Sequence, residues 1–185
     1  MRDLNWSRLT AWRDLIAQFF DAAAMRDYLS EIVEVDITRY LSAPGSIPSR
    51  TLLLTGWLAS RLGWKRMDAK RSGDHWSSRW KSERNEVRVR FTGTVSRPDQ
   101  APGINSIILR TRNKAEFSVA IEQGSSCLTA RASFEGSRLV HSVPQEPLDE
   151  ASLLIRELAQ TGEDVVFKAA LAEALELEKS FRLAG

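Results

Sequence analysis

Glu86-Val87-Arg88-Val89-Arg90-Phe91 is the stretch that decides the fold, because apolar and charged side chains alternate along it. This period of two is typical of a β-strand that buries one of its faces. Short links containing Gly or Pro join the later strands, and short links join antiparallel neighbours. The sequence therefore predicts an antiparallel β-meander. The alternation recurs along residues 33–38, 107–112, 117–121, 128–134 and, over a shorter length, 139–143.

Helical periodicity precedes and follows these strands. Between residues 9 and 19, apolar side chains recur at spacings of 3, 4 and 3, which predicts a helix that Asn5 or Ser7 caps. Residues 21–27 interrupt this pattern. Towards the other end, helices are predicted over residues 149–160 and from Asp164 onward. Helices at both ends with strands between them indicate a single α+β domain over residues 1–185.

The helix expected from Pro48 or Ser49 to Leu62 lies at the centre of the predicted core. Leucines and Trp57 cover most of its circumference, and Gly63 ends it. Gly56 lies in its interior, where glycine costs roughly 1 kcal/mol against alanine, so we expect a close packing contact there. Trp12 and Trp57 lie on apolar helix faces and are expected to pack in the core.

Composition excludes several classes of protein. The chain has 185 residues, of which 43% are hydrophobic and 27% charged, as in an ordinary globular domain. It contains no apolar run of the roughly 20 residues that a membrane span requires. Cys127 is the single cysteine, so no disulfide can form within the chain. We therefore expect a cytoplasmic protein with no membrane partner.

Charge is distributed unevenly along the sequence. Residues 50–114 hold 15 Lys and Arg against 5 Asp and Glu, whereas residues 145–185 hold 4 against 9. A basic middle and an acidic end suggest either attraction within the fold or two surfaces with different partners.

The sequence carries no recognisable catalytic or metal-binding motif. His75 and His141 lie 66 positions apart, and one cysteine cannot build a thiolate zinc site. Phosphate-binding loops, dinucleotide-binding glycine patterns and nucleophile elbows are absent. We therefore expect no enzyme activity, no catalytic or metal-ligating residues and no cofactor. An enzyme built from residues distant in sequence is an alternative interpretation, and it would need a deep pocket lined by a perturbed acid or base. Cys127 is interpreted as a small buried hydrophobe, and a redox role would require a partner thiol or a lowered thiol pKa.

Arginines on the polar phase of the strands form the first candidate interface. If the phases point to the same side, they give the sheet an arginine-rich face, which suits an acidic partner or ligand. The alternative is a solvated face whose charges pair with glutamates on the same or adjacent strands. The residues concerned are Arg88, Arg90, Arg110, Arg112 and Arg131.

Tryptophans among cations form the second candidate interface, in a segment read as a loop between residues 64 and 85. Trp64, Trp76 and Trp80 lie close in sequence to Arg66 and other basic residues. Such a mixture could stack bases and neutralise phosphates, or form a protein-binding patch. The third interpretation is a loop whose tryptophans anchor it to the sheet.

Two tryptophan-containing stretches resemble a known family. Residues 3–13 (DLNWSRLTAWR) and residues 52–64 (LLLTGWLASRLGW) are similar to the C-terminal region of the OpcA family of cyanobacteria and actinobacteria, and residues 169–177 are compatible with it. Members are longer, with a further N-terminal region. Some are linked to redox control through cysteines, for which Cys127 alone gives no intrachain pair. The matching signature positions are Asn5, Trp6, Trp12, Gly56 and Trp57; for Asn5 and Trp6 we favour capping and stapling of the first helix.

The resemblance implies a non-catalytic assembly factor of the oxidative pentose phosphate pathway. Such a protein binds glucose-6-phosphate dehydrogenase as an allosteric activator, promotes its active oligomer and shifts its substrate response. The hypothesis for this chain is that the arginine face and the segment from Trp64 to Trp80 contact the enzyme. The alternative is a single-stranded nucleic-acid-binding module that uses the basic Trp-rich segment, although a net charge of +2 disfavours nucleic acid as a partner.

Overall fold

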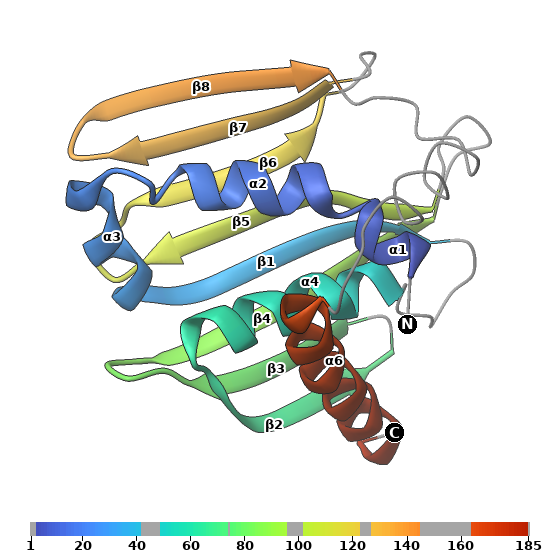
Figure 1. Cartoon of the computed structure of the whole chain (residues 1–185). Coiled ribbons are helices and arrows are strands. Elements are labelled where there is room, and N and C mark those ends of the chain that lie inside the picture. Colours follow the sequence, from blue (N-terminus) through green and yellow to red (C-terminus); the bar gives the residue numbers. More distant parts are fainter. Residues whose placement is uncertain are drawn as a thin grey trace.

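An eight-stranded mixed sheet with helices packed on one of its faces forms the fold (Figure 1). The computed structural model describes residues 3–41, 49–73, 75–95, 102–122, 127–144 and 164–184. The α+β class is confirmed, and the helix predicted over residues 149–160 lies outside the described residues. The elements in chain order are α1 (Leu4–Ser7), α2 (Thr10–Gln18), α3 (Ala23–Ser30), β1 (Ile32–Leu41), α4 (Ser49–Leu62), β2 (Lys65–Ser72), β3 (His75–Lys81), β4 (Glu86–Val95), β5 (Gly103–Thr111), β6 (Glu116–Ile121), β7 (Cys127–Phe134), β8 (Ser137–Pro144) and α6 (Val165–Leu183).

The strand order is β2-β3-β4-β1-β5-β6-β7-β8, so the predicted meander is only partly correct. Strands β5 to β8 do follow one another as antiparallel neighbours, as do β2 to β4. Strand β1, however, lies between β4 and β5 and runs parallel to β4. Alternation reveals a strand and its buried face but not its neighbours. The position of β1 was therefore not accessible from its own residues.

The segment read as a loop over residues 64–85 is a β-hairpin, which corrects the sequence interpretation. Strands β2 and β3 pair antiparallel, and β3 pairs onward with β4. In β3 the buried residues Trp76, Ser78 and Trp80 alternate with more exposed ones. A buried serine between two tryptophans disguised this alternation. The interruption predicted over residues 21–27 is likewise wrong, since α3 begins at Ala23.

The N-terminal helix is two helices, and its cap differs from the prediction. Asp3, rather than Asn5 or Ser7, caps α1, and its Oδ1 accepts the Asn5 backbone N–H at 2.7 Å. The N–H of Leu9 bonds to the carbonyl of Trp6, and α2 then begins at Thr10. Buried side chains of α2 pack over β6 and β7.

Helix α4 lies against α6 in the centre of the helical layer, as Figure 1 shows. A Cβ at Gly56 would overlap the backbone carbonyl oxygen of Ala170 and lie 2.9 Å from the backbone nitrogen of Ala174. The expected close contact at Gly56 is therefore confirmed. Gly63 has a φ of 64°, and the Trp64 N–H bonds to the carbonyl of Ala59 at 2.9 Å, which ends the helix in a Schellman motif.

The core fills the space between the helices and one face of the sheet. Asp164 caps α6 as predicted, with Oδ1 accepting the Phe167 N–H at 2.8 Å. The far end of α6 covers β3 and β4, because Phe181 lies edge-on to the rings of Trp76 and Phe91 at centroid distances of 4.9 and 5.7 Å. Within the described residues, the helices thus cover one face, and none lies on the opposite face.

Candidate functional site

The face of the sheet opposite the helices is the candidate site, and we call it the open face. Its members follow from alternation and register, because directly paired residues share a face. Val35, Val89 and Leu109 are fully buried beneath the helices, so the residues between them point to the other side. The open face therefore collects the more exposed phase of β1 and of β3 to β7, in which buried and less buried residues alternate.

Ion pairs cross the centre of the open face from strand to strand. Asp36 on β1 accepts hydrogen bonds from Arg90 on β4, with Nε–Oδ1 at 2.7 Å and Nη2–Oδ2 at 3.0 Å, and also from Arg110 on β5. Arg110 in turn donates through Nε to Glu116 on β6 at 2.9 Å. Burial lowers the pKa of Arg110, but these two carboxylates outweigh it and raise that pKa. Four adjacent strands are thereby linked by charge-assisted hydrogen bonds.

Two further ion-pair groups flank this centre. On β3, Arg79 donates to Asp68 of β2 at 2.9 Å and to Glu86 of β4 at 3.2 Å. The hydrogen bond from Arg79 lowers the pKa of Asp68. On β7, Arg131 donates to Glu122 at 2.9 Å, and this hydrogen bond lowers the pKa of Glu122.

The structure places four of the five predicted interface arginines on the open face and the fifth in a turn. Arg88, Arg90 and Arg110 lie on the open face, as does Arg131. Arg112 lies in the turn after β5, where its guanidinium donates to the side chain of Asn85. These arginines do share a region of the surface. Arg90, Arg110 and Arg131, however, already form ion pairs with carboxylates of this chain.

The tryptophans expected beside those arginines lie on the opposite side of the sheet. Trp64 and Trp76 are 4% and 8% exposed, and Trp80 is fully buried, with its Nε1 donating to Ser78 at 2.8 Å. Arg66 shares their side and lies 3.6 Å from Glu176 on α6. The arginine face and the tryptophan segment therefore do not form one continuous surface.

Reading residues 64–85 as a loop hid several members of the open face. The loop interpretation places none of three basic residues on a sheet surface. These residues are Lys65 on β2 and Arg79 and Lys81 on β3. The buried phase of β3 was the available signal, because Trp76 and Trp80 are four positions apart and both apolar. Glu34 and Asp36 were likewise missed as partners because the neighbours of β1 were unknown.

The signature positions of the resemblance lie within the helical layer. Trp6, Trp12 and Gly56 are buried, and Trp57 is partly buried against the core. Asn5 is partly exposed within α1. We propose a structural role for these positions, since their contacts are to other parts of this chain.

Cys127 and the histidines lie apart from one another. Cys127 begins β7 and is half-buried opposite Pro144, while His75 and His141 are exposed on β3 and β8. Within the described ranges, no three His, Cys, Asp or Glu side chains gather in a group that could hold a metal ion. Within the same ranges, no helix combines the length and the apolar character needed to cross a membrane.

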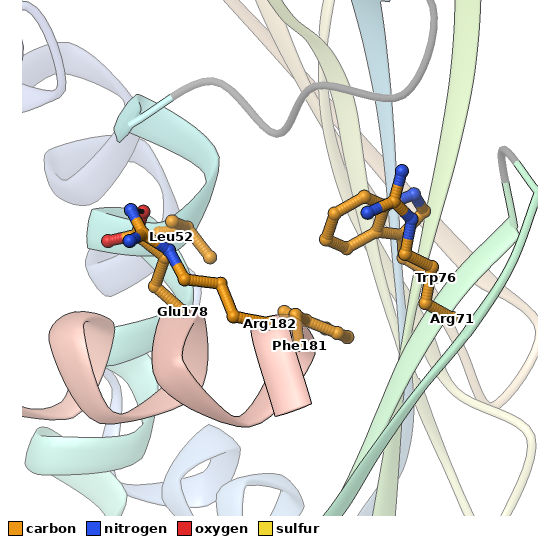
Figure 2. Close-up of a pocket in the computed structure, with 6 residues that line it drawn as sticks. All are labelled: Leu52, Arg71, Trp76, Glu178, Phe181 and Arg182. Carbon is orange, nitrogen blue, oxygen red and sulfur yellow. Dashed lines mark hydrogen bonds and ion pairs between the residues drawn. The ribbon is translucent and has the colours of Figure 1, made fainter. Parts of the chain in front are cut away.

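A small cavity of about 110 Å³ opens between α4, α6 and the β2–β3 hairpin (Figure 2). Leu52, Trp76 and Phe181 form its apolar lining, and Glu178 pairs with Arg182 at 2.6 Å on its helical side. The guanidinium of Arg71 stacks 4.4 Å from the centre of the Trp76 ring. Ligand pockets usually measure about 300–1,000 Å³, so this cavity has room for no more than a small chemical group.

These features define the class of protein: an α+β domain built on one mixed sheet, with helices on one face and ion-paired side chains on the other. Solved structures share this fold. An oxidoreductase, YvaA, from Bacillus subtilis matches with a TM-score of 0.53, covering 97% of this chain and 62% of that one. A dehydrogenase, MviM, from Clostridium difficile matches with a TM-score of 0.50, covering 84% and 56%. At 9% identity in both cases, the likeness shows the fold alone.

The chain belongs to the family described as the C-terminal domain of the glucose-6-phosphate dehydrogenase subunit, and the model of this family matches residues 1–171. A relative from Synechococcus elongatus, named OxPP cycle protein OpcA, is 28% identical over 183 residues, which is 92% of this chain and 40% of the relative. A relative of the same name from Nostoc punctiforme is 41% identical over 76 residues, covering 40% of this chain and 16% of the relative. The chain thus spans less than half the length of these relatives.

Proposed function

We propose that this chain is a non-catalytic subunit that binds glucose-6-phosphate dehydrogenase through its open face and acts in the oxidative pentose phosphate cycle. The family description and the names of the relatives support the partner and the pathway. The observation that carries the mode of binding is the open face itself. An eight-stranded sheet whose described helices all pack against one face offers, on its other face, a broad, rigid surface on which charges are already ordered.

The proposed effect of binding is to promote the active oligomer of the enzyme. An activator must bind one state of its target more tightly than another, and couplings of about 1–3 kcal/mol are typical. Ion pairs between neighbouring strands hold the arginines of the open face in place before binding, which lowers the entropy lost on association. The surface is thereby suited to discriminating between two arrangements of a partner.

Light scattering with a parallel activity assay tests the proposal. The enzyme from the organism that encodes this chain is measured with and without the chain. We expect an increase in mass and a changed response to substrate. An unchanged mass at micromolar concentrations of both proteins would refute the proposed partnership.

A pair of bulky substitutions tests the face. Thr92 is exposed on β4, and its register partner Thr38 places it on the open face, so Thr92→Tyr should hinder docking while suiting a strand. Ala172→Tyr introduces the same side chain at an exposed position of α6, on the other side of the molecule, and serves as the control. Equal binding by both variants would assign the contact to another surface.

Single-stranded nucleic acid is not proposed as a ligand. Binding of this kind relies on aromatic rings on which bases stack. The rings of Trp64, Trp76 and Trp80 are buried beneath the helices and offer no such surface.

A further inference from the structure

One corner of the open face carries positive charge that ion pairs within the described part of the sheet leave unmatched, although the Lys70 ammonium acts on Asp68 of the same strand and helps the hydrogen bond from Arg79 to lower the pKa of that carboxyl. Lys65 and Lys70 on β2, Lys81 on β3 and Arg88 on β4 are all exposed. No ion pair joins any of these four cations to a carboxylate among the residues that the structure describes. We call these four residues the basic corner, and Figure 1 shows their three strands at one end of the sheet.

The strand register places like charges directly opposite each other in the basic corner. Lys65 pairs with Lys81 across β2 and β3. Arg88 lies opposite Arg79 across β3 and β4, although the charge of Arg79 is itself ion-paired with carboxylates of β2 and β4. Like charges at such positions destabilise a sheet. The register therefore gathers positive charge at this corner instead of dispersing it.

Carboxylates that lie opposite the basic corner are engaged elsewhere. Glu34 on β1 is the register partner of Arg88, but its carboxylate forms an ion pair with Arg90 on the same strand as Arg88. Glu86 is the register partner of Lys81, but its carboxylate lies 3.2 Å from the guanidinium of Arg79. Among the described residues, Lys81 and Arg88 therefore have no ion-pair partner, and an anion from outside the domain would supply one.

Protection of a sheet edge explains only part of this arrangement. Lysines on an exposed edge strand prevent strands of other molecules from pairing there, and β2 is an edge strand. Lys65 and Lys70 fit that role. Lys81 and Arg88 lie on β3 and β4, whose two edges are both already paired, so the same explanation does not reach them.

We propose that the basic corner binds an acidic segment of the partner protein. This inference rests on the proposed function and specifies which part of the open face makes the contact. Strands lie about 4.8 Å apart and rise about 3.3 Å per residue, so the cations span about 10 Å across three strands and about 13 Å along them, from Lys81 to Lys70 opposite Ser77, which suits two or more neighbouring carboxylates. The exposed phase of β2, β3 and β4 presents no Trp, Tyr or Phe ring in its described part, which favours an acidic protein segment over a single-stranded nucleic acid.

Neutral substitutions in the basic corner provide the test. Lys65→Gln, Lys81→Gln and Arg88→Gln together remove three charges without breaking an ion pair among the residues that the structure describes. The matched control, Arg26→Gln, Arg61→Gln and Lys114→Gln, removes three exposed charges on α3, on α4 and in the turn after β5. Each triple variant and the original chain are titrated with the enzyme at salt concentrations between about 50 and 200 mM.

The expected result is weaker binding by the corner variant, by about tenfold at the lowest salt, with a smaller loss of affinity as salt increases. The control should bind as the original chain does. The melting temperature of the corner variant should be equal to or higher than that of the original chain, because like-charge pairs are removed. If the corner variant and the original chain bind the enzyme alike, the inference is wrong while the proposed function stands.

Two further measurements separate the remaining outcomes. If the original chain does not bind the enzyme, the proposed function fails. The inference about the basic corner is then tested by NMR, from the chemical shifts of the Lys81 and Arg88 amides on titration with a hexaglutamate peptide. Unchanged shifts would overturn the inference. Tighter binding of an oligothymidylate than of that peptide at the same amides would overturn it in favour of nucleic acid.

Discussion

At the scale of single residues, one indole N–H joins the first helix of the chain to its last. Trp6 Nε1 donates to Oδ2 of Asp164 at 2.8 Å, while Oδ1 of the same carboxylate caps α6. The Trp6 ring lies 5.4 Å from the ring of Phe167, and the guanidinium of Arg13 stacks over it at 3.6 Å. The contacts of Trp6 therefore account for its place in the N-terminal signature through packing and hydrogen bonding.

Replacing Trp6 by phenylalanine should remove the hydrogen bond while keeping an aromatic ring near Phe167. We expect the free energy of unfolding to fall by about 1 kcal/mol, or somewhat more because the acceptor is a carboxylate, as measured by urea denaturation. Asp164→Ala should cost more, since it also removes the cap of α6. If Trp6→Phe costs as much in the Asp164→Ala background as in the original chain, the hydrogen bond contributes nothing.

The pair formed by Asp68 and Arg79 predicts a specific dependence of stability on pH. The hydrogen bond from Arg79 lowers the pKa of Asp68 below its ordinary value of 3.8. The pair therefore stabilises the fold fully above that value, and its contribution is lost as the pH falls through the lower pKa of the folded state.

The comparison that checks this uses Asp68→Asn. The difference in melting temperature between the original chain and this variant should be constant from pH 7 to about 5 and should shrink below about 4. Arg79→Gln should return the pKa of Asp68, followed by NMR, towards its ordinary value. If the difference in melting temperature stays constant down to the lowest pH at which the chain folds, the pair of Asp68 and Arg79 is not the source of the pH dependence.

At the scale of elements, the contact between α4 and α6 depends on a position without a side chain. Gly56 lets the backbone of α6 approach at Ala170 and Ala174. Helix propensity and packing make opposite predictions for Gly56→Ala. Propensity alone would stabilise α4 by about 1 kcal/mol.

Packing should dominate, because the added methyl group meets backbone rather than a flexible side chain. We expect Gly56→Ala to lower the free energy of unfolding by about 1–3 kcal/mol, measured by chemical denaturation. Ala170→Gly should not rescue it, since the obstructing atom is the carbonyl oxygen of Ala170. An increase in stability would show that the two helices separate at little cost.

At the scale of the whole molecule, the helices are distributed so that different helices cover different parts of one sheet. Helix α2 packs over β6 and β7, while the far end of α6 covers β3 and β4 through Phe181. Phe181 is 1% exposed, whereas Leu183, two positions later, is 88% exposed. The two residues therefore offer a matched pair at the same end of α6.

Phe181→Ala should lower the free energy of unfolding by about 3–5 kcal/mol, because it leaves a cavity over Trp76 and Phe91. Leu183→Ala should change it by less than about 0.5 kcal/mol. Equal effects, measured by urea denaturation with tryptophan fluorescence, would indicate that this end of α6 does not cover the sheet.

Local pattern predicted much of the fold and part of the candidate site. Alternation identified β1 and the strands from β4 to β8, and periodicity with capping identified α4 and α6. These signals are local because each reports which side of an element faces away from water. Arg88, Arg90 and Arg110 could be placed on the polar phase of their strands for the same reason. The β2–β3 hairpin was missed because basic and serine residues obscured its alternation.

By itself, the sequence determined the α+β class, the family resemblance and the polar phase of most strands. Only the tertiary structure decided that β1 lies between β4 and β5, that the tryptophans of residues 64–80 are buried beneath helices, and that Lys65 faces Lys81. Neighbouring strands are chosen by contacts between residues far apart in the chain, whereas periodicity depends on residues a few positions apart. The charge balance of the open face follows from those distant pairings, and it is therefore a property of the folded sheet.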